Sequence, residues 1–97
     1  MPLVWIPALM RKLTDGQDQV SVEGSTMQQV VDNLETAFPG IKDRVCDGDR
    51  IRPGLAVVID EEVARLGLLQ RVKEDSEIHF VPAVSGGAKG RGLNRTR

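Results

Sequence analysis

The sequence predicts an α+β fold in which one main helix packs on one face of a small mixed β-sheet. Only one long segment, residues 26–38, carries apolar residues at helical spacing. Shorter segments on both sides of it alternate apolar and polar residues, or run apolar over a few positions, as strands do. With 97 residues the chain has room for a single hydrophobic core, so we expect one domain at residues 1–85.

Two strands joined in a hairpin are expected at the start of the chain. In residues 3–13, Val4, Ile6, Leu9 and Leu13 lie among polar or proline positions. The later stretch "QVSVEG" alternates valine with polar residues, and the intervening "TDGQD" is rich in turn-forming residues. The two stretches therefore read as neighbouring strands.

The helix is the strongest local prediction. In "STMQQVVDNLETAFPG" the residues that share the apolar face are Met27, Val30, Val31, Leu34, Ala37 and Phe38. Ser25 or Thr26 can cap its start, with Gln28 or Gln29 at the reciprocal position, and the following proline and glycine end it.

The second half of the chain predicts a loop and further strands. Residues 40–54 are rich in turn formers and predict a connecting loop, with at most a short turn of helix. "LAVVID" predicts a strand at residues 55–59, and residues 63–72 are expected to be irregular with a short strand or turn. "IHFVPAV" predicts the last strand, at residues 78–84.

Charge divides the chain into an acidic body and a basic end. Residues 1–87 contain nine Lys or Arg against 14 Asp or Glu, whereas residues 88–97 contain four Lys or Arg and no acid. An acidic body argues against nucleic-acid binding and favours a basic protein partner. The sequence has no apolar run that could span a bilayer and no secretion signal, so we expect a cytoplasmic protein without a membrane partner.

Few residues of the body could carry chemistry of their own. Cys46 has no neighbouring histidine to activate it, and a lone His79 makes a poor metal site. The acidic corner Asp60, Glu61 and Glu62 is read as a solvated surface or a partner contact rather than a metal site. The glycine-rich stretches match no nucleotide-binding motif. We therefore expect neither an enzyme nor a bound metal or cofactor.

The stretches "FPGIKDRV", "LAVVIDEE" and above all "EIHFVPAVSGG" resemble the prokaryotic ubiquitin-like sulfur carriers. That family includes the small subunit of molybdopterin synthase and the thiamine sulfur carrier, and the cysteine-pathway carrier looks most similar. The resemblance covers residues 3–87 and implies a β-grasp fold.

The resemblance also implies a reaction at the diglycine. In the family an E1-like adenylyltransferase and sulfurtransferase uses ATP to adenylate the terminal carboxylate, here that of Gly87, and sulfide converts it to a thiocarboxylate. A sulfur-accepting biosynthetic enzyme then takes the sulfur. Val84, Ser85 and Gly86 would enter the enzyme's channel with Gly87, because glycine lets the backbone approach closely. The product could be cysteine, a molybdenum cofactor, thiamine or another sulfur compound.

Strand alternation predicts a docking face on the sheet. If the neighbouring residues point toward the helix, Ala56, Val58, His79 and Val81 point away from it. In ubiquitin-like proteins the corresponding face contacts partners, which is what the resemblance implies here. An ordinary exposed sheet face is the alternative reading.

The end of the chain departs from the family pattern. Gly87 is followed by Ala88 and nine further residues, so it has no free carboxylate. We expect residues 86–97 to be a flexible diglycine and basic tail that is cut between Gly87 and Ala88. The resemblance implies that a zinc-dependent protease of the JAMM type makes this cut. Two alternatives remain at this stage: a protein modifier conjugated through Gly87, or a binding module whose uncleaved basic tail contacts an anionic partner such as RNA.

Overall fold

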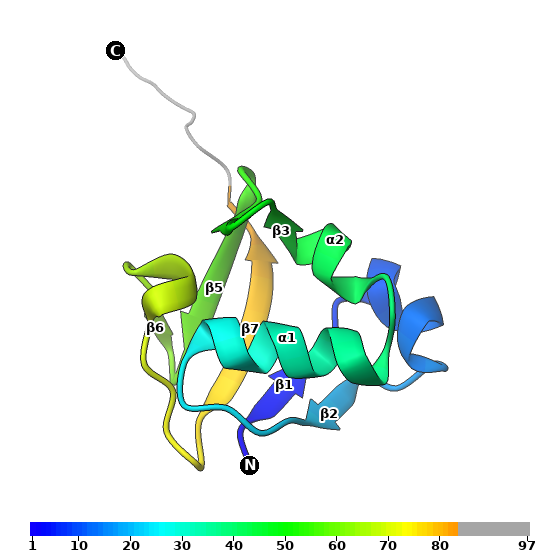
Figure 1. The fold of residues 1–97 in the computed structure, drawn as a ribbon, viewed down its shortest axis with the longest axis horizontal. Coiled ribbons are helices and arrows are strands. Elements are labelled where there is room, and N and C mark those ends of the chain that lie inside the picture. Colours follow the sequence, from blue (N-terminus) through cyan, green and yellow to red (C-terminus); the bar gives the residue numbers. More distant parts are fainter. Residues whose placement is uncertain (84–97) are drawn as a thin grey trace.

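The computed structural model describes residues 1–83 and shows the predicted α+β architecture (Figure 1). The strands are β1 (Leu3–Trp5), β2 (Gln19–Ser21), β3 (Cys46–Asp47), β4 (Arg50–Ile51), β5 (Leu55–Ile59), β6 (Glu62–Val63) and β7 (Glu77–Pro82). The α-helices are α1 (Met27–Ala37) and α2 (Ile41–Val45), and two 3₁₀ helices are η1 (Ala8–Thr14) and η2 (Gly67–Leu69). None of the helices in this part of the chain has the length and hydropathy that a bilayer crossing needs.

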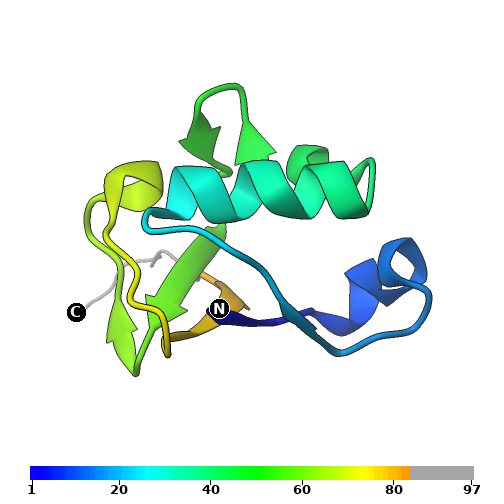
Figure 2. The ribbon, with the colours of Figure 1, turned by 60° about the horizontal axis from the view of Figure 1, so that its bottom comes forward.

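Five strands form one mixed sheet in the order β2-β1-β7-β5-β6. The two central strands, β1 and β7, run parallel, and every other pair in this sheet is antiparallel. Helix α1 crosses one face of the sheet, with the β3–β4 hairpin on the same side (Figure 2). Because the parallel pair joins the first and last strands, the chain's final described strand lies in the middle of the sheet.

Helix α1 begins and ends where the sequence predicts, to within one residue. The Thr26 hydroxyl accepts a hydrogen bond from the Gln29 backbone N–H at 3.2 Å, and the Gln29 side chain accepts one from the Ser25 N–H at 2.8 Å. These bonds satisfy one donor of the first turn and the N–H of the residue before the N-cap. After the helix, Gly40 adopts φ 102°, a conformation that favours glycine and redirects the chain into α2.

The core lies between α1 and the inner face of the sheet, as predicted. The buried side chains include Met27, Val30, Val31 and Leu34 from α1, and Val4, Ile6, Val22, Val57, Ile59, Ile78 and Phe80 from the sheet side. Val20, Leu55 and Phe38 are partly buried against them. Helix α2 and the second half of the chain add Ile41, Val45, Cys46, Leu68 and Val72.

The prediction of one strand through residues 3–13 is wrong after Trp5. The strand ends there, and residues Ala8–Thr14 form η1 instead. Pro7 has no N–H to continue a ladder, and its carbonyl accepts a hydrogen bond from the Met10 N–H at 2.9 Å. Met10 is therefore turned into the core, whereas Leu9, expected in a strand, is 85% exposed.

Residues 40–54 contain more regular structure than the predicted loop. They form α2 and the β3–β4 hairpin, whose turn uses Gly48 at φ 67°. Strands this short carry too little alternation to be seen in a sequence. The prediction of a short strand or turn within residues 63–72 is confirmed by β6 and η2. The last strand, β7, begins one residue earlier than predicted and ends at Pro82, before the predicted end, because its partner there, Leu55, is the first residue of β5.

Candidate functional site

Strand β7 carries the chain out of the sheet toward the diglycine. It is hydrogen-bonded along both edges, to β1 and to β5. At its end the Ala83 N–H donates to the Gly54 carbonyl at 2.9 Å, so the strand is held up to the last described residue. The expected channel-entering and cleavage residues, namely Val84, Ser85, Gly86, Gly87 and Ala88, lie outside the described residues.

The four residues expected on the docking face lie together on the sheet. The β5–β7 register places Ala56 opposite Val81 and Val58 opposite His79. All four are half-buried, and the residues alternating with them are buried under α1. They form the surface called here the open face, which is the side of the sheet that α1 does not cover.

Trp5 extends the open face and was not picked out from the sequence. The parallel register of β1 and β7 places it opposite His79, and the two rings stack with centroids 5.3 Å apart and planes 10° from parallel. The indole N–H also donates to the Glu77 carboxylate at 3.3 Å. Strand alternation could have placed Trp5 outward, but its pairing with the last strand is a long-range register that local pattern does not reveal.

All three residues of the acidic corner are exposed, and the Asp60 side chain is also hydrogen-bonded to the start of β7. Asp60 and Glu61 form the turn between β5 and β6 with positive φ of 51° and 74°. The Asp60 carboxylate accepts hydrogen bonds from the Glu77 backbone N–H at 2.9 Å and the Ser76 hydroxyl at 2.8 Å. These bonds hold the pKa of Asp60 below its usual value. Within residues 1–83, no three His, Cys, Asp or Glu side chains converge as a metal site would require.

Cys46 lies in the core rather than at a reactive surface. Its side chain is 3% exposed, at the junction of α2 and β3. Burial raises the pKa of the Cys46 thiol, which favours the unreactive protonated form. The cysteine is therefore a packing residue here.

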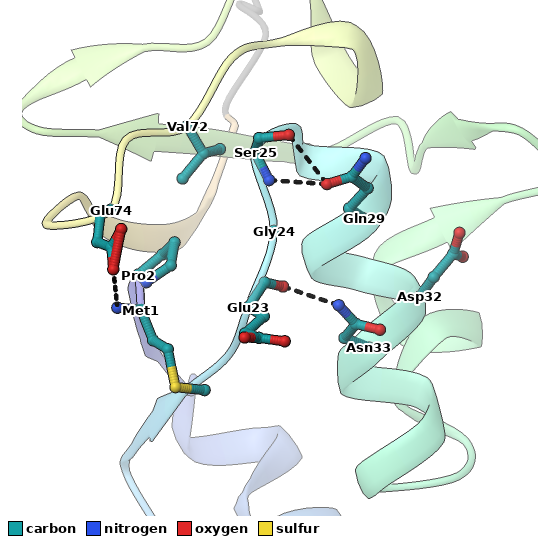
Figure 3. A pocket seen from close by; sticks show the side chains of 10 residues that line it. All are labelled: Met1, Pro2, Glu23, Gly24, Ser25, Gln29, Asp32, Asn33, Val72 and Glu74. Atoms are coloured by element: carbon teal, nitrogen blue, oxygen red, sulfur yellow. Dashed lines mark hydrogen bonds and ion pairs between the residues drawn. The ribbon is translucent and has the colours of Figure 1, made fainter.

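A broad polar cavity of about 620 Å³ lies at the other end of the sheet from the exit of β7 (Figures 1 and 3). Its polar groups are already engaged: the Asn33 amide donates to the Glu23 carbonyl at 2.9 Å, and the Met1 amine lies 3.8 Å from Glu74. Gly24 passes so close to α1 that a Cβ there would lie 2.7 Å from a Val30 methyl carbon. The cavity reflects how the loop before α1 packs and presents no nucleophile with a base.

A smaller hollow of about 320 Å³ opens on the open face at the start of β7. Its lining residues are Val58, Asp60, Glu61, Glu77 and His79. It combines an apolar residue, an imidazole and three carboxylates from two neighbouring strands and the turn that follows β5. Chemically it can receive a cation but has no activated nucleophile.

The fold has a mixed sheet in which the first and last strands pair in parallel, and one main helix lies across that sheet. This arrangement defines a ubiquitin-like β-grasp protein. The model of the ThiS family matches residues 4–87, and the chain belongs to that family. It is 30% identical to the sulfur carrier protein CysO of Mycobacterium tuberculosis over 87% of this chain and 96% of the relative.

Solved structures agree with this assignment. CysO in a BexX/CysO complex from Amycolatopsis orientalis superposes with a TM-score of 0.82 at 30% identity, covering 90% of this chain and all of that one. CysO of Mycobacterium tuberculosis gives a TM-score of 0.80 at 28% identity, with 87% and 100% covered. The small archaeal modifier protein 1 of Methanosarcina acetivorans shares the fold, with a TM-score of 0.71 at 24% identity over 89% and 95% of the two chains.

Proposed function

We propose that the protein is a sulfur carrier made as a precursor. The observation that carries the proposal is the diglycine at residues 86–87, which follows the central strand β7 after residues 83–85 in a β-grasp domain of the ThiS family. Relatives of similar length bear the name sulfur carrier protein, which supports the same role here. The domain supplies the terminus and the docking surface, and partner enzymes supply the catalysis.

The proposed chemistry takes place at the Gly87 carboxyl group after the tail is removed. One carboxylate oxygen attacks the α-phosphate of ATP in an E1-like partner and releases pyrophosphate, leaving an acyl adenylate. A sulfide sulfur then attacks the carbonyl carbon, AMP leaves, and a thiocarboxylate remains for a sulfur-accepting enzyme. Residues 84–87 span at most about 14 Å beyond Ala83, which allows the terminus to enter an active site while the domain stays outside.

Tail removal is the step that creates the reactive group. In the full chain the Gly87 carbonyl is in a peptide bond with Ala88, so there is no carboxylate for ATP to activate. Hydrolysis of this bond by a zinc-dependent JAMM-type protease would release residues 88–97, which carry four positive charges and no negative charge. Cysteine is the product proposed first, because the sequence looks most similar to the cysteine-pathway carrier, and another sulfur-containing metabolite or cofactor is the alternative product.

The open face is the surface proposed to contact the E1-like partner. Ala56, Val58, His79 and Val81 lie on the two strands β5 and β7, and β7 leads directly to the reacting terminus. A contact on these strands would therefore fix the direction in which the terminus leaves the domain. The structure of a BexX/CysO complex supports the more general point that a relative of this chain docks on a partner protein.

Two measurements test the proposal. Intact mass of the protein isolated from its native cell should show a species ending at Gly87, part of it heavier by one oxygen-to-sulfur exchange. Only the full 97-residue mass, or a mass joined to a target protein, would contradict the carrier role.

In vitro, a chain ending at Gly87 should release pyrophosphate with the partner enzyme and ATP, whereas the full chain and the truncated Gly87→Ala variant should not. Equal turnover by the full and truncated chains would contradict the precursor role.

A further inference from the structure

The hollow on the open face has a composition that sulfur transfer does not require. Three acidic residues, Asp60, Glu61 and Glu77, line it together with Val58 and His79. Within the described part of the chain, no lysine or arginine lines it. Its negative charge is concentrated beside apolar surface, where complementary charge on a partner selects orientation as well as affinity.

One wall of the hollow is the His79 imidazole, which is backed by Trp5. The Trp5 indole stacks on the His79 imidazole, yet Trp5 does not line the hollow, so the imidazole lies between the indole and the hollow. Val58, which is paired with His79 across β5 and β7, forms the adjoining wall. A flat ring next to a methyl-bearing side chain offers a surface suited to a planar, weakly hydrated cation.

The three carboxylates differ in how many of their oxygens can still accept a hydrogen bond from a ligand. Asp60 uses one oxygen for the Glu77 N–H and the other for the Ser76 hydroxyl, so it contributes a fixed charge. Glu77 accepts the Trp5 indole N–H on Oε1, which orients the side chain and leaves Oε2 available. Glu61 is exposed at the turn. Two carboxylates with free oxygens beside a planar wall match the fork of donors on a guanidinium group.

We propose that this hollow receives an arginine side chain of the partner protein that docks on the open face. The inference rests on the proposed function only in treating the open face as the partner surface. The arginine would lie on the Val58 and His79 wall, with its N–H groups donating to Glu77 and Glu61. Such an anchor at the start of β7 would set the rotation of the domain on its partner, several residues before the reacting terminus.

A titration of the isolated protein tests the site without any partner. The chain ending at Gly87 is titrated with N-acetyl-arginine amide and, separately, with N-acetyl-citrulline amide, which has the same shape but no charge. NMR should show saturable shifts of the His79 ring and Val58 methyl signals with the arginine derivative alone. Equal responses to the two compounds, or none to either, would overturn the proposal.

Variants locate the response in the hollow. Glu77→Gln and Glu61→Gln should each weaken the arginine response several-fold, because each removes one charge-assisted acceptor. Glu74→Gln is the matched control, since Glu74 is a highly exposed carboxylate that lines the separate cavity near Met1. An unchanged response in Glu77→Gln, or equal weakening in Glu74→Gln, would show that the arginine derivative binds elsewhere.

The chain's own tail is the competing occupant, because it carries three arginines. If the His79 and Val58 signals of the full chain already lie at their arginine-bound positions, the tail fills the hollow, and the assignment to a partner is overturned.

With the partner enzyme, Glu77→Gln should raise KM for the carrier about tenfold and leave kcat unchanged. If the wild-type protein is active and the variant has an unchanged KM, the arginine site is refuted and the proposed function stands. If the wild-type chain ending at Gly87 releases no pyrophosphate, the proposed function is refuted, and the titration alone then decides whether the hollow binds arginine.

Discussion

Strands β5 and β7 present two faces built from alternating residues of the same short segments. On the inner face Val57, Ile78 and Phe80 are at most 7% exposed under α1. On the open face, one residue away along each strand, Val58 and His79 are only half-buried. The same backbone ladder thus carries one surface that is used in folding and one that is left available, and substitutions on the two should separate stability from partner binding.

The largest effect is expected on the inner face. Ile78 is fully buried in the middle of the core, so Ile78→Ala removes packed atoms and leaves a cavity. The free energy of unfolding should fall by about 2–5 kcal/mol, measured by denaturant titration. Val81→Ala, three residues along on the half-buried open face, should cost less than about 1 kcal/mol. Similar losses in both variants would mean that the open face is also core.

The inner face is also where the sequence was most informative. The helical spacing in α1 and the alternation in "LAVVID" and "EIHFVP" each repeat a simple period, so the core residues and the open face could both be predicted from local pattern. What local pattern could not provide was the parallel pairing of β1 with β7, which brings Trp5 onto His79 across 74 positions of sequence. The hollow was missed because it depends on the register of β5 against β7 and on the turn after β5, which are also long-range features.

Breaks in periodicity account for the errors elsewhere. Residues 8–14 contain apolar residues but no strand alternation, and after Pro7 ends the ladder the segment turns as a 3₁₀ helix. The β3–β4 hairpin has strands of two residues, which is too short for a period to appear. A position that is fixed by one hydrogen bond, and not by burial that repeats along a helix or strand, leaves no periodic pattern in the sequence.

A second, intermediate effect is expected on the open face and should appear in binding rather than in folding. In the chain ending at Gly87, the double variant Val58→Lys and Val81→Lys places two charges in the proposed contact with the E1-like partner. KM for the carrier in pyrophosphate release should rise at least about tenfold, with little change in the unfolding midpoint.

Leu9→Lys provides the matched control for this variant. Leu9 is an apolar residue that is 85% exposed on η1, away from β5 and β7, so a lysine there should leave KM unchanged. If Leu9→Lys raises KM as much as the double variant does, the partner does not distinguish the open face from the rest of the surface, and the contrast between the two faces of the sheet has no functional meaning.

The smallest effect is expected at Asp60, which hydrogen-bonds the turn after β5 to the start of β7 at the edge of the open face. Its carboxylate bonds the Glu77 N–H and the Ser76 hydroxyl, and these bonds hold its folded pKa below the reference value of 3.8. The unfolded chain therefore takes up this proton first as pH falls. The stabilisation is complete above the unfolded pKa and is lost as pH drops through the lower, folded pKa.

Asp60→Asn should lower the unfolding midpoint slightly at neutral pH, and the difference from wild type should shrink progressively below pH 3.8. Because the other acids titrate in both proteins, the difference isolates Asp60. A difference that stays constant into acid would show that the carboxylate's charge does not strengthen these bonds, and that the corner is held by the turn itself.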